Sequence, residues 1–134
     1  MPVKQEIEIG QRDKLFNLSE ALELFPLVQS LTKQHQLELA PMQSRLSKTL
    51  SNDPRRAVFE QEFEQLVSKW KNKIELLGLQ VVGLWSVEFN VGSGAISWRY
   101  PELELLYYRH AGDSSSGRTN LRDYIDAHDP DWAS

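Results

Sequence analysis

Residues 81–110 read VVGLWSVEFNVGSGAISWRYPELELLYYRH, and this stretch decides the fold. Its apolar and polar residues largely alternate, which is typical of strands with one buried face. Two turn signals divide it. Val91-Gly92 suits a two-residue hairpin loop, and Pro101-Glu102 suits a type I turn because proline presets φ. The stretch therefore predicts three antiparallel strands joined by two tight turns.

The two-residue loops also predict which residues face each other across the strands. Val87 is expected opposite Ile96, and Trp98 opposite both Trp85 and Leu105. One face is then almost wholly apolar, with Val81, Trp85, Val87, Phe89, Ile96, Trp98, Tyr100, Leu103, Leu105 and Tyr107. The opposite, mixed face is where we expect function, and it is predicted to carry Val82, Leu84, Ser86, Glu88, Ala95, Ser97, Arg99, Glu104, Leu106, Tyr108 and His110.

The chain before this stretch predicts two helices. Asn17-Leu18-Ser19-Glu20 is a capping box, and the apolar residues after it recur at helical spacing. Pro26 is expected to kink this first helix, and Pro41 offers a second point for a break. The second helix is predicted to open at Asp53-Pro54 and to end at Gly78.

We therefore expect one α+β domain over residues 1–134, with an antiparallel helical hairpin packed on one face of a three-stranded antiparallel β-meander and a short C-terminal helix. A hydrophobic content of 40% over 134 residues is enough for one core. In chain order we expect an arm or edge strand (1–15), the helical hairpin (16–78), the meander and a loop (79–118), and a short helix and tail (119–134).

The composition excludes several classes of function. A formal net charge of -4 with dispersed lysines and arginines argues against a nucleic-acid partner. The absence of cysteine excludes disulfides, thiolate metal sites and cysteine nucleophiles. The N-terminus MPVKQEIEIGQRDK does not resemble a signal peptide, and no run reaches the roughly 20 apolar residues of a membrane helix. We therefore expect a cytoplasmic protein without a membrane segment.

Four segments carry a resemblance to a known family: FNLSEALELFP, GLWSVEF, SWRYPE and LLYYRHAGDSSSGR. In this order, over residues 16–118, they resemble domain-of-unknown-function family 2203, a family of small bacterial proteins. The family pattern has a capped helix with an alanine and a later proline, a strand ending Gly-Leu-x-Asp-Phe, then Cys-Trp, Gly-Glu, Trp-His and a closing Gly-x-x-Gly-Arg. The matching positions are Ala21, Pro26, Phe89, Trp98, Glu102, Gly117 and Arg118.

The departures from this pattern fall at polar positions. Glu88 stands for the family's aspartate, Ser97 for its cysteine, Pro101 for its glycine before the glutamate, Tyr108-Arg109 for its Trp-His, and Ser114 for an earlier glycine. His110 is one place later than the family's histidine and would face the other way on a strand. If that histidine is functional in the family, the role is lost or moved in this chain. The resemblance implies no activity.

Glu88, Tyr108 and His110 are the sharpest catalytic candidates, because a carboxylate, a phenol and an imidazole can bind a cation or transfer a proton. A solvated sheet face is the favoured alternative. No second carboxylate pairs with Glu88 at motif spacing, and no nucleophile is placed beside a base.

The other candidates concern ligand and metal binding. Arg99 is expected to face Glu104 across the strands, as a surface ion pair worth under about 1 kcal/mol rather than as a ligand site. Arg118 has two interpretations, since it can hold an anionic ligand over the mixed face or bond loop carbonyls. We predict no metal site, because Asp126, His128, Asp129 and Asp131 lack the spacing of a calcium loop.

Two functions from different classes follow. The first is a non-enzymatic protein-association module, homodimeric or with another protein partner, that uses the apolar part of the mixed face, namely Val82, Leu84, Leu106 and Tyr108. The alternative is a small-molecule- or metal-binding enzyme centred on Glu88, Glu102, Tyr108, His110 and Arg118. No cofactor is predicted for either.

Overall fold

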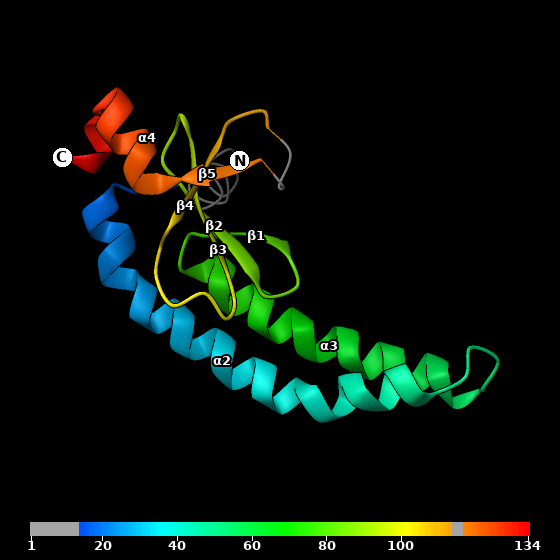
Figure 1. Ribbon diagram of the computed structural model, residues 1–134. Coiled ribbons are helices and arrows are strands. Elements are labelled where there is room, and N and C mark those ends of the chain that lie inside the picture. Colours follow the sequence, from blue (N-terminus) through cyan, green and yellow to red (C-terminus); the bar gives the residue numbers. More distant parts are fainter. Residues whose placement is uncertain (1–13, 114–116) are drawn as a thin grey trace, which may run out of the picture.

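A long helical hairpin and an antiparallel sheet make up most of the molecule (Figure 1). The computed structural model describes residues 14–113 and 117–134. Helices α2 (Leu18–Lys48) and α3 (Arg55–Leu76) run side by side in opposite directions, and the sheet lies at one end of the pair. The predicted α+β class and helical hairpin are confirmed. The N-terminal segment 1–15, which was expected to be a mobile arm or an edge strand, lies almost wholly outside the described residues.

Helix α2 begins at the predicted capping box. The backbone N–H of Glu20 donates to Oδ1 of Asn17 at 2.7 Å, and the N–H of Asn17 donates to the Glu20 carboxylate at 3.0 Å. Pro26 and Pro41 both lie inside α2, yet it continues across them as one curved helix (Figure 1). Both prolines are exposed, so the carbonyls that they leave without a partner can reach water. The break expected at Pro41 therefore does not occur.

The far half of the hairpin extends beyond the sheet, and we call residues 40–69 the arm (Figure 1). The buried residues of α2 end at Leu39, and those of α3 are Trp70 and Ile74, so no residue of the arm is buried. Past α3, Gly78 has a φ of 98°, which confirms the predicted glycine at the helix end. The arm adds little to the core between the hairpin and the sheet.

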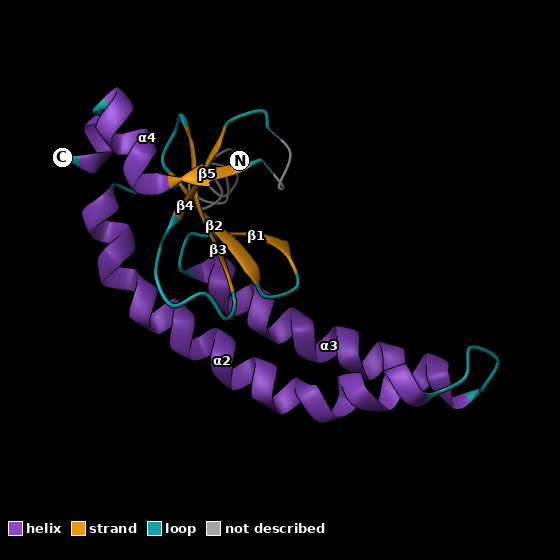
Figure 2. Cartoon of the chain, in the orientation of Figure 1, coloured by secondary structure: helices purple, strands orange, loops and turns teal. Residues whose placement is uncertain are grey.

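The sheet has five antiparallel strands in the order β1-β2-β3-β4-β5, so the predicted count of three is wrong (Figure 2). One predicted strand is in fact two, because Trp85 has a φ of 59° and turns the chain between them. A fifth strand follows the loop after residue 113. The strands are β1 (Gln80–Gly83), β2 (Ser86–Asn90), β3 (Gly94–Arg99), β4 (Tyr107–His110) and β5 (Arg118–Asn120).

The hairpin of β2 and β3 has a different register from the predicted one but the same faces. Val87 pairs with Trp98 rather than with Ile96, because the loop is Gly92-Ser93 and the N–H of Val91 donates to the Gly94 carbonyl at 3.0 Å. Gly92 has a φ of 98°, a conformation that is unfavourable for a β-branched residue such as Val91. The shift is two residues, so each side chain keeps its predicted face.

The connection from β3 to β4 is longer than predicted, and this error does exchange faces. A turn forms one residue earlier than predicted, with Tyr100-Pro101 rather than Pro101-Glu102 at its centre, since the N–H of Glu102 donates to the Arg99 carbonyl at 2.8 Å. The chain then runs through residues 103–106 as a loop, and Ser97 pairs with Tyr107. Compared with the predicted pairing of Trp98 and Leu105, β4 is shifted by one residue, which reverses its two faces.

The helices cover the predicted apolar side of β2 and β3. Val87, Phe89, Ile96 and Trp98 are fully buried there. The ring of Phe25 meets Trp98 edge-on with 5.6 Å between centroids, and Trp70 meets Trp85 at 4.9 Å. Inside this layer the indole Nε1–H of Trp70 donates to the hydroxyl of Thr32 at 2.9 Å.

The C-terminal segment covers the β4 end of the same side. It contains α4 (Leu121–His128), which confirms the predicted short helix, and η1 (Asp131–Ala133). Because of the one-residue shift, Tyr108 points to this side, where its ring stacks on Tyr124 at 3.9 Å and on Trp132 at 5.7 Å. Tyr108 thus belongs to the core, whereas we had predicted it on the mixed face.

Candidate functional site

The strand pairing gathers four polar residues on the sheet face away from the helices, and Glu102 in the turn after β3 reaches them through Arg118. We call these five the polar cluster: Glu88, Ser97, Glu102, Arg109 and Arg118. Alternation on β2 and β3 places Glu88 and Ser97 opposite each other on this face. Arg109 of β4 and Arg118 of β5 are also direct cross-strand partners. Two like charges in this arrangement repel each other, so each arginine needs a carboxylate of its own.

Glu88 and Arg109 form a bidentate ion pair. Nε of Arg109 lies 2.6 Å from one carboxylate oxygen of Glu88, and Nη2 lies 2.7 Å from the other. The Glu88 side chain is 2% exposed and that of Arg109 is 18% exposed. Glu88 is therefore neither solvated, as the favoured interpretation had it, nor available to a ligand, because a buried carboxylate is stable only when it is paired.

Arg118 and Glu102 form the second bidentate pair. The two Nη atoms of Arg118 donate to the Glu102 carboxylate at 2.8 and 2.6 Å, and Nε donates to the hydroxyl of Ser97 at 3.0 Å. The guanidinium also lies over the ring of Tyr107, 4.0 Å from its centroid. Burial raises the pKa of Glu102, but hydrogen bonds from Arg118 and from the N–H of Arg99 outweigh it, so the pKa lies below its ordinary value.

The remaining predicted site residues do not converge on Glu88. Arg99 pairs with Ser86 in the sheet rather than with Glu104, which lies in the loop before β4. His110 shares the helix side of β4 with Tyr108, and their rings are 6.4 Å apart. Since Arg109 between them faces Glu88, both point away from that carboxylate.

Tyr108 is held as a neutral phenol. Burial raises the pKa of Tyr108 to about 12, although a hydrogen bond with the hydroxyl of Ser93 at 2.9 Å opposes this shift. A phenol with this pKa is a poor proton donor at neutral pH. The three side chains proposed for proton transfer thus occupy two faces of the sheet.

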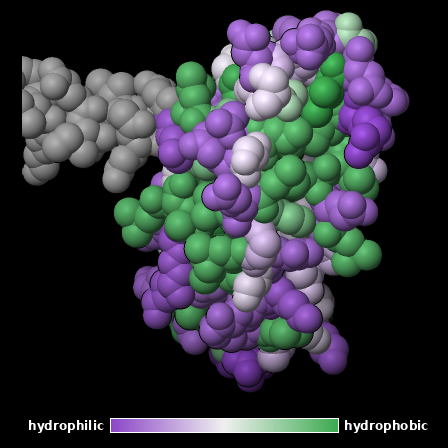
Figure 3. Space-filling view, turned by 90° about the vertical axis from the view of Figure 1, so that its left-hand side faces the viewer, coloured by the Kyte–Doolittle hydropathy of each residue, from purple (hydrophilic) through white to green (hydrophobic). Residues whose placement is uncertain are grey.

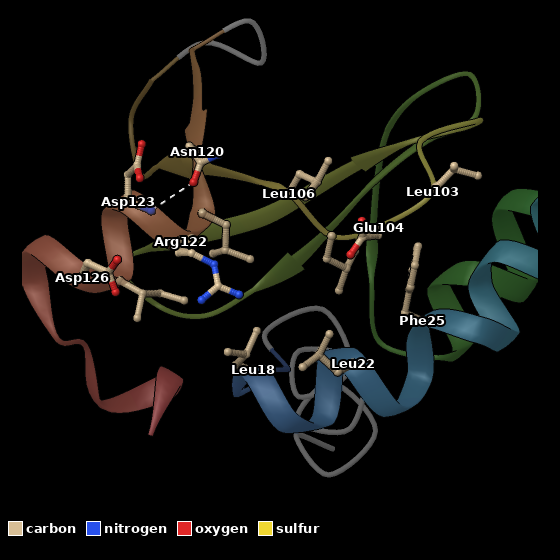
Figure 4. A pocket seen from close by; sticks show the side chains of 13 residues that line it. Leu18, Leu22, Phe25, Leu103, Glu104, Leu106, Asn120, Arg122, Asp123 and Asp126 are labelled. Carbon is tan, nitrogen blue, oxygen red and sulfur yellow. Dashed lines mark hydrogen bonds between the residues drawn. The ribbon is translucent and has the colours of Figure 1, made fainter.

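A different feature offers a concave surface, and we call it the apolar groove. It is a hollow of about 700 Å³ between the start of α2, the loop at residues 103–106 and α4 (Figure 4). Leu22, Leu103 and Leu106 on its walls are 52%, 81% and 42% exposed. The other apolar residues that line it are Leu18, Phe25, Leu105, Leu121 and Ile125.

The rim of the apolar groove is mainly acidic. Glu104, Asp123 and Asp126 contribute carboxylates, and Arg122 contributes one guanidinium. Asn120 caps α4 here, since its Oδ1 accepts the N–H of Asp123 at 3.0 Å (Figure 4). Figure 3 shows the corresponding side of the molecule, where hydrophobic residues gather between hydrophilic ones. The groove therefore combines exposed leucines with negative charge.

Sequence reasoning missed both the partner of Glu88 and the apolar groove. A signal for the partner existed, because a carboxylate on a strand of buried residues requires a cation nearby, and only a few arginines lie on neighbouring strands. The groove had no such signal. The sequence Leu103-Glu104-Leu105 alternates as a strand does and so predicted a strand here. Residues 103–106 instead form a loop, and the loop exposes Leu103 and Leu106.

Comparison of the chain with protein-family models, with curated proteins and with solved structures finds no match. Within residues 14–113 and 117–134, no helix has the length and hydrophobicity needed to cross a membrane. In the same part of the chain, no three histidine or acidic side chains are grouped as a metal site requires.

Proposed function

We propose that this chain is a non-enzymatic protein-association module and that the apolar groove is its binding surface. The observation that carries the proposal is the exposure of Leu22, Leu103 and Leu106 around one hollow. Exposed leucines that gather at a concave site are typical of a surface that a partner covers. This surface replaces the mixed sheet face of the sequence-based hypothesis, because Tyr108 lies in the core and Leu106 lines the groove.

The chemistry of the groove suggests the kind of partner. A leucine-lined groove next to helices accepts the apolar face of an amphipathic helix. The rim carboxylates Glu104, Asp123 and Asp126 favour basic residues on the flanks of that helix. The proposed partner is therefore a protein segment that combines leucine-like side chains with lysine or arginine.

The polar cluster supports association over catalysis. The carboxylates of Glu88 and Glu102 are each occupied by a bidentate arginine, and the hydroxyl of Ser97 accepts from Arg118. These groups are therefore engaged with one another rather than directed at a substrate position. Their evident role is to join β2, β3, β4 and β5 on the sheet face away from the helices.

Membership of domain-of-unknown-function family 2203 is also a proposal. It is supported by position, since the residues at the family's aspartate, cysteine, glutamate, histidine and final arginine positions form the polar cluster together. A cytoplasmic location belongs to the same proposal and is testable by cell fractionation.

A synthetic amphipathic helix with leucines at helical spacing and lysines beside them tests the binding surface. Fluorescence anisotropy should detect its binding, and Leu22→Asn or Leu106→Asn should weaken it roughly tenfold, because each removes a leucine side chain worth about 1.5–3 kcal/mol on burial. The matched control is Leu37→Asn, since Leu37 is 59% exposed but lies outside the groove.

A second peptide with glutamates in place of the lysines tests the rim. It should bind more weakly, and the difference between the two peptides should shrink as salt screens the rim carboxylates. The proposal is wrong if the lysine peptide does not bind, or if Leu37→Asn weakens binding as much as the groove variants do.

A further inference from the structure

The arm is a long projection that ends in an ordered turn, and we call residues 45–58 the tip. At the tip, Nη1 of Arg56 donates to the carbonyls of Leu46 at 2.9 Å and Thr49 at 2.7 Å, which satisfies the end of α2. Asp53 accepts the N–H of Arg55 at 2.9 Å at the start of α3. The turn between the helices is therefore held by side chains, although no residue of the arm is buried.

The tip exposes apolar side chains of its own. Leu50 is 72% exposed and Val58 is 55% exposed. The side chains of a helical hairpin gain stability when they are buried between the helices, whereas these two are exposed. The end of the hairpin that contains them is the one farthest from the sheet (Figure 1). The tip thus presents an apolar surface on a pre-formed scaffold, which lowers the entropy lost on binding.

The charge of the tip is opposite to that of the groove rim. Residues 45–58 carry four basic side chains, those of Arg45, Lys48, Arg55 and Arg56, against the acidic Asp53, and Glu60 just beyond them pairs with Arg56 at 3.7 Å. The groove rim has three acidic side chains against one arginine. Basic and apolar groups at one end of the molecule therefore match acidic and apolar groups at the other.

We infer that the apolar groove of one copy receives the arm tip of a second copy. This inference rests on the proposed function and names the partner segment as residues 45–58 of the same protein. The groove lies at the start of α2 and the tip at its end, so a molecule cannot fill its own groove (Figure 1). The contact joins two different surfaces, so it either repeats head-to-tail from copy to copy or closes as a two-fold pair in which each tip fills the other copy's groove.

A mixing experiment tests this arrangement. Val58→Asn impairs the tip and leaves the groove intact, and Leu106→Asn does the reverse. By sedimentation velocity, the wild-type protein should associate with increasing concentration, less so at high salt, and each variant alone should associate roughly tenfold more weakly. An equal mixture of the two variants should form a one-to-one dimer and nothing larger, because it contains one intact groove and one intact tip per pair.

The outcomes separate this inference from the proposed function. A wild-type protein that stays monomeric at high concentration yet binds the lysine peptide overturns the inference and leaves the function standing. Association as strong as that of the wild type in either single variant, or a mixture that yields no dimer, places the contact elsewhere and also overturns the inference. Absence of peptide binding defeats the proposed function itself. The control Leu37→Asn should associate as the wild type does.

Discussion

Replacing Arg109 by methionine should destabilise the protein by roughly 3 kcal/mol. The change leaves the carboxylate of Glu88 buried without its partner, and breaking a buried ion pair in this way costs about 3–5 kcal/mol. The lower end applies because the Arg109 side chain is 18% exposed, so water can partly replace it. Arg109 also donates to the carbonyl of Asp113 at 2.8 Å, a contact that the variant loses as well.

Urea unfolding followed by tryptophan fluorescence measures this loss as a lower midpoint at unchanged slope. Replacing both partners, Glu88→Leu with Arg109→Met, should recover most of the stability, since two apolar side chains leave no buried charge. The matched control is Arg55→Met, which removes an ion pair to Asp53 of similar length, 2.8 Å, from an arginine that is 74% exposed. That control should change stability by less than about 1 kcal/mol.

The reasoning is refuted if Arg109→Met and Arg55→Met destabilise the protein equally. It is also refuted if the double replacement is less stable than Arg109→Met alone. Removing the unpaired carboxylate of Glu88 would then not restore stability, so that buried charge could not be the cause of the loss.

Three further predictions concern the core. Thr32→Val should cost about 1–3 kcal/mol in urea unfolding, because the buried Nε1–H of Trp70 loses its acceptor; unchanged stability would contradict the hydrogen bond. His35 has a pKa below its ordinary value because of burial and the nearby charge of Lys73, so the unfolded chain binds its proton more readily. The free energy of unfolding should therefore keep its full value above about pH 6.5 and decrease as the pH falls below that value. His35→Gln should make this decrease shallower, and an equally steep decrease in the variant would exclude His35 as its source. Gly94→Ala should strongly destabilise the sheet, because the added carbon would overlap the neighbouring strand, and a fully stable variant would show that β4 can move away.

The helices could be predicted because their signals are local. A capping box at Asn17 and a glycine with positive φ at Gly78 depend only on neighbouring residues, and both occur where they were expected. The faces of β2 and β3 could also be predicted, since alternation survives a register shift of two residues. Trp98 accordingly lies beneath α2 as the pattern indicated.

Which side chains of β4 face the helices could not be predicted, because tertiary contacts decide the length of the loop before this strand. The indole of Trp98 donates to the Glu102 carbonyl at 2.8 Å, and Leu105 is drawn into the core at 8% exposure. These contacts hold residues 100–106 as a loop, although their alternation is typical of a strand. One extra residue then moved Tyr108 into the core and brought Arg109 to Glu88, so the candidate site changed with it.

The unbroken course of α2 has a consequence for the dimensions of any assembly. At 1.5 Å per residue, its 31 residues form a rod of roughly 46 Å whose first turns line the groove and whose last turn reaches the tip. The length of α2 would therefore determine the distance between associated copies. Adding seven residues to α2 and seven to α3 would lengthen that spacing by about 10 Å, a change that small-angle scattering can resolve.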